Sequence, residues 1–407
     1  MRGFPPRLTE KQCRKNTIAL SRRLPEAPIL TIAVTIDSPS LDIGPQWDDL
    51  VRRASSNVFM NPAALTAACE TNFARIRMLL AWETEGASRK LVGIWALQLR
   101  KVAPFWPVVL EALPYDYAFL SSPVVDPEFV GEVIPAFFAA IEQSPLLPNV
   151  VSLKSFDAES PAHAAMMKLL IGRGAQHLML SETVRPFVTR EFGVKRTGST
   201  RKKLRQDWNR LSALGAVEIV NDRSPASVEQ AFETFLAMEK ASWKGGQGTA
   251  LLSDAHDAAF VRRLLHHLAV RGDASVALLR INGEAIAAQV LMYCGATAYT
   301  WKTAYDAKFS KYSPGILLID RVTEQLFAGP DIMEINSCAA EESFMGHLWA
   351  GRRTMVDMLI DIGPGRSLDY RLEAGRQLGY QGLRDLRDRL RNRHSRRPNA
   401  RPHHDAA

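Results

Sequence analysis

Two tight-turn signals constrain the fold of this chain more than any other feature. Asn282-Gly283 and Gly295-Ala296 divide the apolar residues 275–302 into extended runs. Asn-Gly favours a two-residue hairpin turn, because both of its residues accept the positive φ angles that such a turn requires. Three consecutive antiparallel strands are therefore predicted. A loop over residues 307–315 and then an apolar helix follow them.

The segments on either side alternate between strand-like and helix-like apolar patterns. A chain of 407 residues is expected to form two domains of roughly 150–200 residues each. Strands are expected at residues 29–36, 74–82, 91–99, 117–120, 150–156, 177–188, 217–220, 332–335 and 355–362. Helices are expected from residue 46, after Asn61, and at residues 127–143, 161–171, 200–214, 227–241, 254–270, 315–327 and 344–353. The second half repeats the order of the first coarsely, which predicts a duplicated α+β fold.

The positive charge of the chain is concentrated at its ends. The formal net charge is +8, and residues 1–23 and 366–407 each carry +6, so the residues between them carry −4. Terminal charge runs are usually solvated appendages. Binding of these ends to RNA, to anionic lipid or to an acidic partner is the alternative. Because the body is acidic, we do not expect a nucleic-acid partner for the fold itself.

The cysteine and histidine patterns predict no metal site. The four cysteines show no CxxC spacing, and the adjacent His266 and His267 do not share a helix face as two metal ligands would. The cysteines are therefore expected to be reduced thiols in a cytoplasmic protein. No segment approaches 18 apolar residues, so no membrane span is predicted.

The loop before the apolar helix has the composition of a phosphate site. It contains Lys308, Lys311 and Ser313, and the helix starts near Gly315. Backbone N–H groups at a helix N-terminus, the helix dipole and two lysines all favour an anion there. The alternative is a plain loop in which Ser313 caps the helix.

Several short motifs of the second half occur in a fixed order. They are Arg201-Lys-Lys-Leu-Arg205 with Leu211 and Gly215, Glu239-Lys-Ala-Ser-Trp-Lys-Gly-Gly-Gln-Gly-Thr-Ala-Leu251, Ala304-Tyr-Asp306 and Ser313-Pro-Gly315. With these motifs, residues 198–360 resemble the acetyltransferase domain of the CelD-like group, GNAT-superfamily proteins associated with cellulose and exopolysaccharide biosynthesis. The first half resembles the degenerate N-terminal GNAT lobe that such proteins and the related Fem peptidyltransferases carry.

The resemblance implies two tandem GNAT-like lobes, each a mixed, mostly antiparallel sheet flanked by helices. It also implies an enzyme that transfers an acetyl or other acyl group from acyl-CoA, without a metal, to an amino or hydroxyl group. The expected acceptor is a small molecule or a saccharide, such as a polysaccharide or envelope precursor. Polysaccharide-synthesis machinery is the expected partner. A Fem-like transfer from aminoacyl-tRNA and a non-catalytic accessory subunit are the alternatives.

The same resemblance implies roles for individual residues. The residues expected to bind acyl-CoA are Lys308, Lys311, Tyr312, Ser313 and Gly315. The loop lacks the usual Arg/Gln-x-x-Gly-x-Gly/Ala pattern, which keeps the aminoacyl-tRNA alternative open.

Three residues are candidates for the chemistry of transfer. In an acyl transfer, a carboxylate or a water chain removes the acceptor's proton, and a tyrosine often protonates the leaving thiolate. Tyr305, Asp306 and Glu334 are the catalytic candidates. For each of them, a surface or capping role is the alternative.

Trp243 and Lys244 are the candidates for substrate contact. They precede the flexible Gly245-Gly-Gln-Gly248 segment, and an aromatic ring beside a cation can stack on a sugar while the lysine meets an anionic group. The alternative is a tryptophan that fills the seam between the lobes.

The predicted domain organisation has four parts. A disordered basic segment at residues 1–28 precedes an N-terminal lobe at residues 29–190. The catalytic lobe is expected at residues 191–363, and an Arg-rich helix with a disordered tail at residues 364–407.

Overall fold

The computed structural model of the protein describes residues 31–39, 42–85, 88–194, 198–363 and 365–395. The predicted N-terminal segment of residues 1–28 lies outside this part of the chain. The strands are β1 (Thr31–Asp37), β2 (Ile76–Glu85), β3 (Ser88–Lys101), β4 (Val108–Glu111), β5 (Val124–Val125), β6 (Val150–Asp157), β7 (His177–Thr189), β8 (Val217–Val220), β9 (Ala274–Ile281), β10 (Glu284–Cys294), β11 (Thr297–Tyr305), β12 (Glu334–Asn336) and β13 (Gly351–Asp361).

Helices cover the strands, in agreement with the predicted α+β class. The α-helices are α1 (Gly44–Val51), α2 (Pro62–Glu70), α3 (Val130–Gln143), α4 (Pro161–Arg173), α5 (Ser199–Ser212), α6 (Pro225–Ala241), α7 (Trp243–Gly246), α8 (Ala255–Val270), α9 (Pro314–Ala328), α10 (Phe344–Leu348) and α11 (Leu368–Ser395). The short 3₁₀ helices are η1 (Val58–Met60), η2 (Pro127–Phe129), η3 (Leu251–Ser253) and η4 (Ala307–Tyr312). None of the helices that the structure describes is long and apolar enough to cross a membrane.

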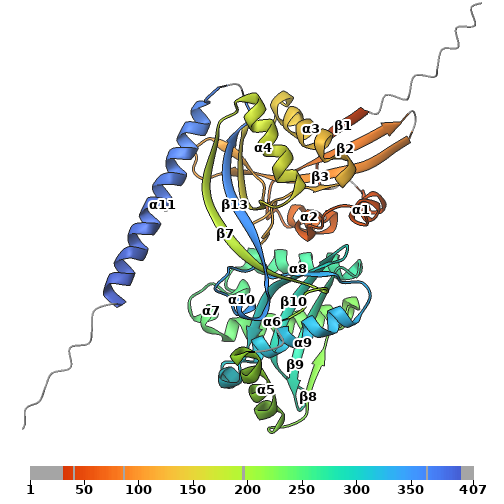
Figure 1. Ribbon diagram of the computed structural model, residues 1–407, viewed down its shortest axis with the longest axis vertical. Helices are drawn as coiled ribbons and strands as arrows, with labels where there is room; N and C mark the ends of the chain where they lie inside the picture. The colour runs from red at the N-terminus through yellow and green to blue at the C-terminus, as the bar shows by residue number, and fades with distance from the viewer. Residues whose placement is uncertain (1–30, 40–41, 86–87, 195–197, 364, 396–407) are drawn as a thin grey trace, which may run out of the picture.

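All strands belong to one mixed sheet that runs through both halves of the molecule (Figure 1). The strand order is β1-β2-β3-β4-β6-β13-β7-β12-β11-β10-β9-β8, with β5 paired to β3. Most neighbours are antiparallel, whereas β4 with β6 and β11 with β12 are parallel. The predicted mixed, mostly antiparallel sheet is therefore confirmed.

Strands β7 and β13 connect the two halves of the sheet. They pair antiparallel from the Gly351–Phe187 pair to the Ile360–His177 pair. From Met355 to Asp361, β13 also pairs with β6 of the first half. The last residues of β7 pair with β12 of the second half. The last strand in the sequence is thus shared with the first half of the fold.

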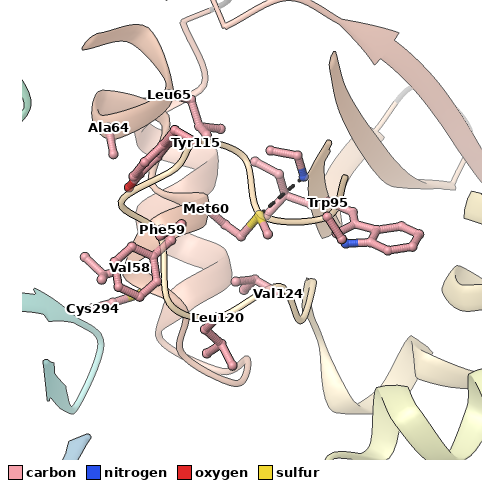
Figure 2. Close-up of a cluster of buried hydrophobic side chains, with 14 of the residues drawn as sticks. Val58, Phe59, Met60, Ala64, Leu65, Trp95, Tyr115, Leu120, Val124 and Cys294 are labelled. Carbon is pink, nitrogen blue, oxygen red and sulfur yellow. Dashed lines mark hydrogen bonds between the residues drawn. The ribbon is translucent and has the colours of Figure 1, made fainter. Parts of the chain in front are cut away.

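The hydrophobic core is also shared between the halves. Figure 2 shows Cys294 of β10 beside Val58 of η1. The Phe59 ring lies edge-on to the Tyr299 ring of β11, with 5.8 Å between the centroids, and the Tyr299 hydroxyl donates to Ser56 O at 2.8 Å. We infer that the two halves stabilise each other.

The predicted turn between β9 and β10 is confirmed. Asn282 and Gly283 have φ angles of 51° and 85°. Asn282 Oδ1 also accepts a hydrogen bond from Ala216 N at 2.9 Å, which attaches the turn to the start of β8.

Two sequence-based expectations for local structure are wrong. Residues 117–120 are not a strand; the strands in that region are β4 and β5. The helix expected at residues 344–353 ends at Leu348, and β13 already begins at Gly351. Gly351 allows this close approach, since a Cβ there would lie 2.7 Å from Phe187 O.

We expect Gly351→Ala to lower the free energy of unfolding by about 1–3 kcal/mol, because the new methyl group must displace the Phe187 backbone. Gly172→Ala in α4 is the matched control. No atom lies within 4 Å of its added Cβ, and the change should be neutral or stabilising by up to about 1 kcal/mol. Urea unfolding midpoints measure both, and equal midpoints for the two variants would contradict the packing argument.

Candidate active site

Strands β11 and β12 form a fork in the sheet. They pair in parallel at the positions of Thr297, Ala298 and Tyr299, and β12 ends at Asn336 while β11 continues to Tyr305. At the base of the fork, Thr300 Oγ1 donates to Ser337 O at 2.9 Å. Beyond this point the side of β11 that faces away from β10 has no strand partner among the described residues. An extended ligand with amide groups can pair with such an edge.

A β-bulge in β11 lies just above the base of the fork. Val290 pairs with Lys302 and Leu291 with Thr300, so Trp301 is the extra residue. Bulges redirect side chains and often occur next to active sites. Trp301 is buried, and its Nε1 donates to Tyr117 O at 2.9 Å. The bulge therefore attaches β11 to the loop that follows β4.

Lys302 is the most unusual ionisable group beside the fork. Its Nζ lies 4.9 Å from the centre of the Tyr117 ring and 5.3 Å from that of Trp301. No carboxylate of the described residues lies within 4 Å of this nitrogen. Burial lowers the pKa of Lys302 to about 8. The neutral form of this amine is therefore more populated near neutral pH than that of an ordinary lysine, whose pKa is 10.5.

Two polar pairs lie near Lys302, and one member of them, Glu239, is buried. Glu239 of α6 is 1% exposed and accepts from Lys244 Nζ at 3.0 Å and from Leu251 N at 2.9 Å. The Tyr117 hydroxyl donates to Asp257 Oδ2 at 2.6 Å. Burial, together with this hydrogen bond, raises the pKa of Tyr117. We call Lys302, Glu239, Lys244, Tyr117 and Asp257 the polar cluster.

The loop at the end of β11 contains the residues that were expected to bind a phosphate. Asp306 caps η4 by accepting from Lys308 N at 2.9 Å. Ser313 has a φ of 53° and accepts from Lys203 Nζ of α5 at 3.1 Å. Lys311 and Tyr312 share η4, where the Lys311 Nζ lies 5.0 Å from the centre of the Tyr312 ring.

Gly315, the second residue of α9, lies close to β11. A Cβ at this position would lie 3.3 Å from Thr303 Cγ2 and 3.7 Å from Tyr305 Cδ1. Pro314 has no N–H, and the N–H groups of Ile316 and Leu317 donate to Ser313 O at 3.0 and 3.1 Å. Within the first turn of α9, Gly315 therefore carries the one N–H to which the described residues give no partner, and the helix dipole adds to its attraction for an anion.

The sequence of the second half matches a family model. Residues 198–344 match the model described as an acetyltransferase (GNAT) domain. The chain carries a GNAT-type acetyltransferase domain. This match confirms the expected enzyme class, an N-acetyltransferase of the GNAT type, and a GNAT domain implies an acyl-CoA co-substrate.

Similarity to solved structures extends over most of the chain. FemX is similar over 84% of this chain and 100% of its own, at 12% identity and a TM-score of 0.57. The C-terminal domain of a putative lysylphosphatidylglycerol synthetase from Agrobacterium fabrum is similar over 81% of this chain and 94% of its own, at 14% identity and a TM-score of 0.47.

A tandem GNAT protein from the clavulanic acid biosynthesis pathway is similar over 83% of this chain and 100% of its own, at 13% identity and a TM-score of 0.44. At 12% identity, the similarity to FemX is one of fold. No curated protein matches the sequence.

The structure places Glu334 apart from the other catalytic candidates of the GNAT domain. Glu334 pairs with Thr297 in the sheet, eight residues before Tyr305 on β11. At 3.3 Å per residue this separation is about 26 Å. Both carboxylate oxygens of Glu334 bind Arg353, at 2.8 and 2.9 Å. The pair lies in the wall of a cavity of about 320 Å³ between the two halves.

The two substrate candidates differ in their surroundings. Lys244 belongs to the polar cluster through Glu239, whereas the Trp243 side chain is 63% exposed. Tyr305 is 40% exposed at the end of β11. Among the residues that the structure describes, no group of three or more His, Cys, Asp or Glu side chains is placed to hold a metal ion.

Sequence reasoning missed Lys302 and Tyr117, and it quoted Glu239 only as the start of a motif, without a role in the site. Two signals were present in the pattern. Glu239 falls on the apolar face of α6, four residues after Phe235, and Lys302 interrupts a strand that is otherwise apolar or threonine-rich. Nothing in the local sequence of Tyr117 indicates that it packs against β11, because that contact is made across the two halves.

Proposed function

We propose that this protein transfers an acetyl or related acyl group from acyl-CoA to an amino or hydroxyl group of a saccharide, such as a polysaccharide or envelope precursor. Lys302 beside the β11–β12 fork carries the proposal. A partly buried lysine without a carboxylate partner, with a pKa of about 8, is suited to accept a proton from the attacking group.

The fork and the adjoining loop supply the donor site of this proposal. The pantetheine amides pair with the free edge of β11, and the phosphates lie at the N-terminus of α9. Lys308, Lys311 and Ser313 of the predicted loop surround the phosphates, together with Tyr312 and Gly315. Lys203 extends the cationic surface, because it already reaches Ser313.

The polar cluster supplies the acceptor side. The acceptor's nitrogen or oxygen attacks the thioester carbon, its proton passes to the neutral Lys302, and the C–S bond breaks to release the CoA thiolate. Tyr305 is the proposed donor of a proton to that thiolate through a water, because its ring lies beside Gly315 at the phosphate end of the fork. Lys244 and the exposed Trp243 contact the saccharide, and Asp306 positions the loop by capping η4. The CelD-like assignment, the lobe boundaries and the polysaccharide partner remain parts of this proposal.

Removal of the loop lysines should weaken donor binding. We expect Lys203→Ala, Lys308→Ala and Lys311→Ala each to raise the Kd for acetyl-CoA by about tenfold or more, since charge-assisted hydrogen bonds contribute about 1.5–3 kcal/mol. Lys168→Ala, on the far helix α4, is the control. Calorimetric titration measures the change. Unchanged Kd values for all three variants would show that the phosphates of acetyl-CoA do not bind at this loop.

The fold similarity to FemX makes transfer from aminoacyl-tRNA the second candidate. Activity with acyl-CoA and activity with charged tRNA as the donor distinguish the two candidate functions. Transfer that requires charged tRNA and is insensitive to CoA would support the second candidate. An unchanged cellular phenotype in a Lys302→Met variant would instead favour a non-catalytic accessory role.

A further inference from the structure

Helix α11 is attached to the rest of the protein by one face only. Glu373, which is 1% exposed, accepts from Trp106 Nε1 at 3.0 Å. One further contact is made by Gln381, whose Nε2 donates to Leu180 O of β7 at 2.8 Å. The helix therefore runs beside β7 and β13 at the outside of the molecule (Figure 1).

The opposite face of α11 presents leucines to solvent. Leu368, Leu372 and Leu383 are 67%, 39% and 69% exposed. Their spacings of four and eleven residues place them on one side of the helix, because 3.6 residues complete a turn. Leu378 and Tyr380, at 49% and 65% exposure, flank this side. Such a stripe has no partner among the described residues.

A second apolar group lies beside the helix. The loop between β3 and β4 carries Phe105, which is fully exposed, and Val102, which is 49% exposed. The next residue, Trp106, makes the hydrogen bond to Glu373. The exposed phenylalanine therefore lies next to the first half of α11. Packing among the described residues does not explain a ring in full contact with water at this position.

Cations accompany these apolar side chains. Lys101 at the start of the loop and Arg371 and Arg384 on α11 are exposed. Within residues 368–384, Asp369 is the one exposed acid. The sequence from residue 366 to the end carries a net charge of +6. The surface thus combines exposed apolar groups with an excess of positive charge.

We propose that α11 and the 102–106 loop form a docking surface for an anionic lipid bilayer, with Phe105, Tyr380 and the leucine stripe at the headgroup boundary and the arginines on the lipid phosphates. An amphipathic helix with arginines at its sides binds in this manner. The apolar groups favour a bilayer over a nucleic acid, because phosphate contacts alone need no exposed Phe or Leu. The positive flanks disfavour a second copy of the same helix. The proposal is independent of acyl transfer.

Co-sedimentation of the full chain with vesicles tests the proposal. We expect binding to phosphatidylcholine vesicles that contain about 30% phosphatidylglycerol, and little binding to phosphatidylcholine alone. Phe105→Ser and Leu383→Ser should each lower the partition coefficient about tenfold. Phe192→Ser and Leu214→Ser are matched controls, since these residues are 76% and 49% exposed in the second half of the fold. The controls should bind like the wild-type protein.

Three results would overturn the proposal. One is an absence of binding to the anionic vesicles at low salt. Another is binding that Phe105→Ser and Leu383→Ser leave unchanged, which would assign it to charge alone or to the basic N-terminal segment. The third is a dimer, seen by analytical ultracentrifugation, that Leu383→Ser dissociates while vesicle binding persists. Circular dichroism spectra identical to wild type would show that the variants are folded.

Discussion

Lys302→Met is expected to lower the turnover number for acyl transfer by about 10²–10⁴-fold, the usual contribution of a general base. Methionine has a similar length and no basic nitrogen, so it fills the space between the Tyr117 and Trp301 rings without accepting a proton. Acetyl-CoA affinity should change little, because the proposed phosphate site lies beyond Tyr305, three residues or about 10 Å further along β11. Release of free CoA thiol with an amino sugar as acceptor measures the turnover.

The pH dependence of kcat/KM tests whether Lys302 acts as a proton acceptor or as a fixed positive charge. In the wild-type enzyme, kcat/KM should rise with pH through an apparent pKa of about 8, because the neutral Lys302 is the active form. Lys302→Arg keeps the charge but cannot accept a proton, so it should be as inactive as Lys302→Met. If Lys302→Arg keeps most of the activity, the residue stabilises negative charge and the proposed base is wrong.

The same pKa shift has a consequence for stability. The folded-state pKa of Lys302 is below the ordinary value of 10.5, so the unfolded chain binds more protons between about pH 8 and pH 10.5. Burial of the charged amine therefore costs stability below pH 8, and this cost disappears as the pH rises through that window. Lys302→Met should for this reason be as stable as the wild-type protein, or more stable, at pH 7.

Phe59→Ala is expected to lower the free energy of unfolding by about 3–5 kcal/mol. Phe59 is fully buried and contacts the rings of Tyr115, Phe119 and Tyr299. Since Tyr299 belongs to the second half, both halves should lose stability together. Urea unfolding followed by tryptophan fluorescence and by circular dichroism should show one shared, shifted transition.

The control for this prediction is Phe105→Ala. Its ring is fully exposed, and the change should alter stability by less than about 0.5 kcal/mol. Two separate transitions in Phe59→Ala, with only the first one shifted, would show that the halves unfold independently. That result would contradict the shared core.

Local features of this fold could be predicted from the sequence. The Asn282-Gly283 turn requires positive φ angles that few other residue pairs accept, and the structure has them. Asn61 accepts from Ala63 N and Pro62 begins α2, as their residue types indicate. These features depend only on neighbouring residues. The α+β class followed from them together with the apolar periodicity.

Contacts between the halves could not be predicted in this way. The pairing of β13 with β7 and β6 joins residues that lie about 160–210 positions apart, and no local pattern specifies the partner of a buried strand. The same limit applies to the site. Tyr305, Asp306 and the loop lysines were found because they are consecutive, whereas the polar cluster joins α6, α7, α8, β11 and the loop after β4.

A structure of the protein bound to acetyl-CoA tests the central claim most directly. We predict that the pantetheine arm lies in the fork between β11 and β12, that the phosphates lie at the N-terminus of α9, and that the thioester is within reach of Lys302 Nζ directly or through one water. Acetyl-CoA bound elsewhere on the protein, or with its thioester on the side of the sheet away from the polar cluster, would contradict the account.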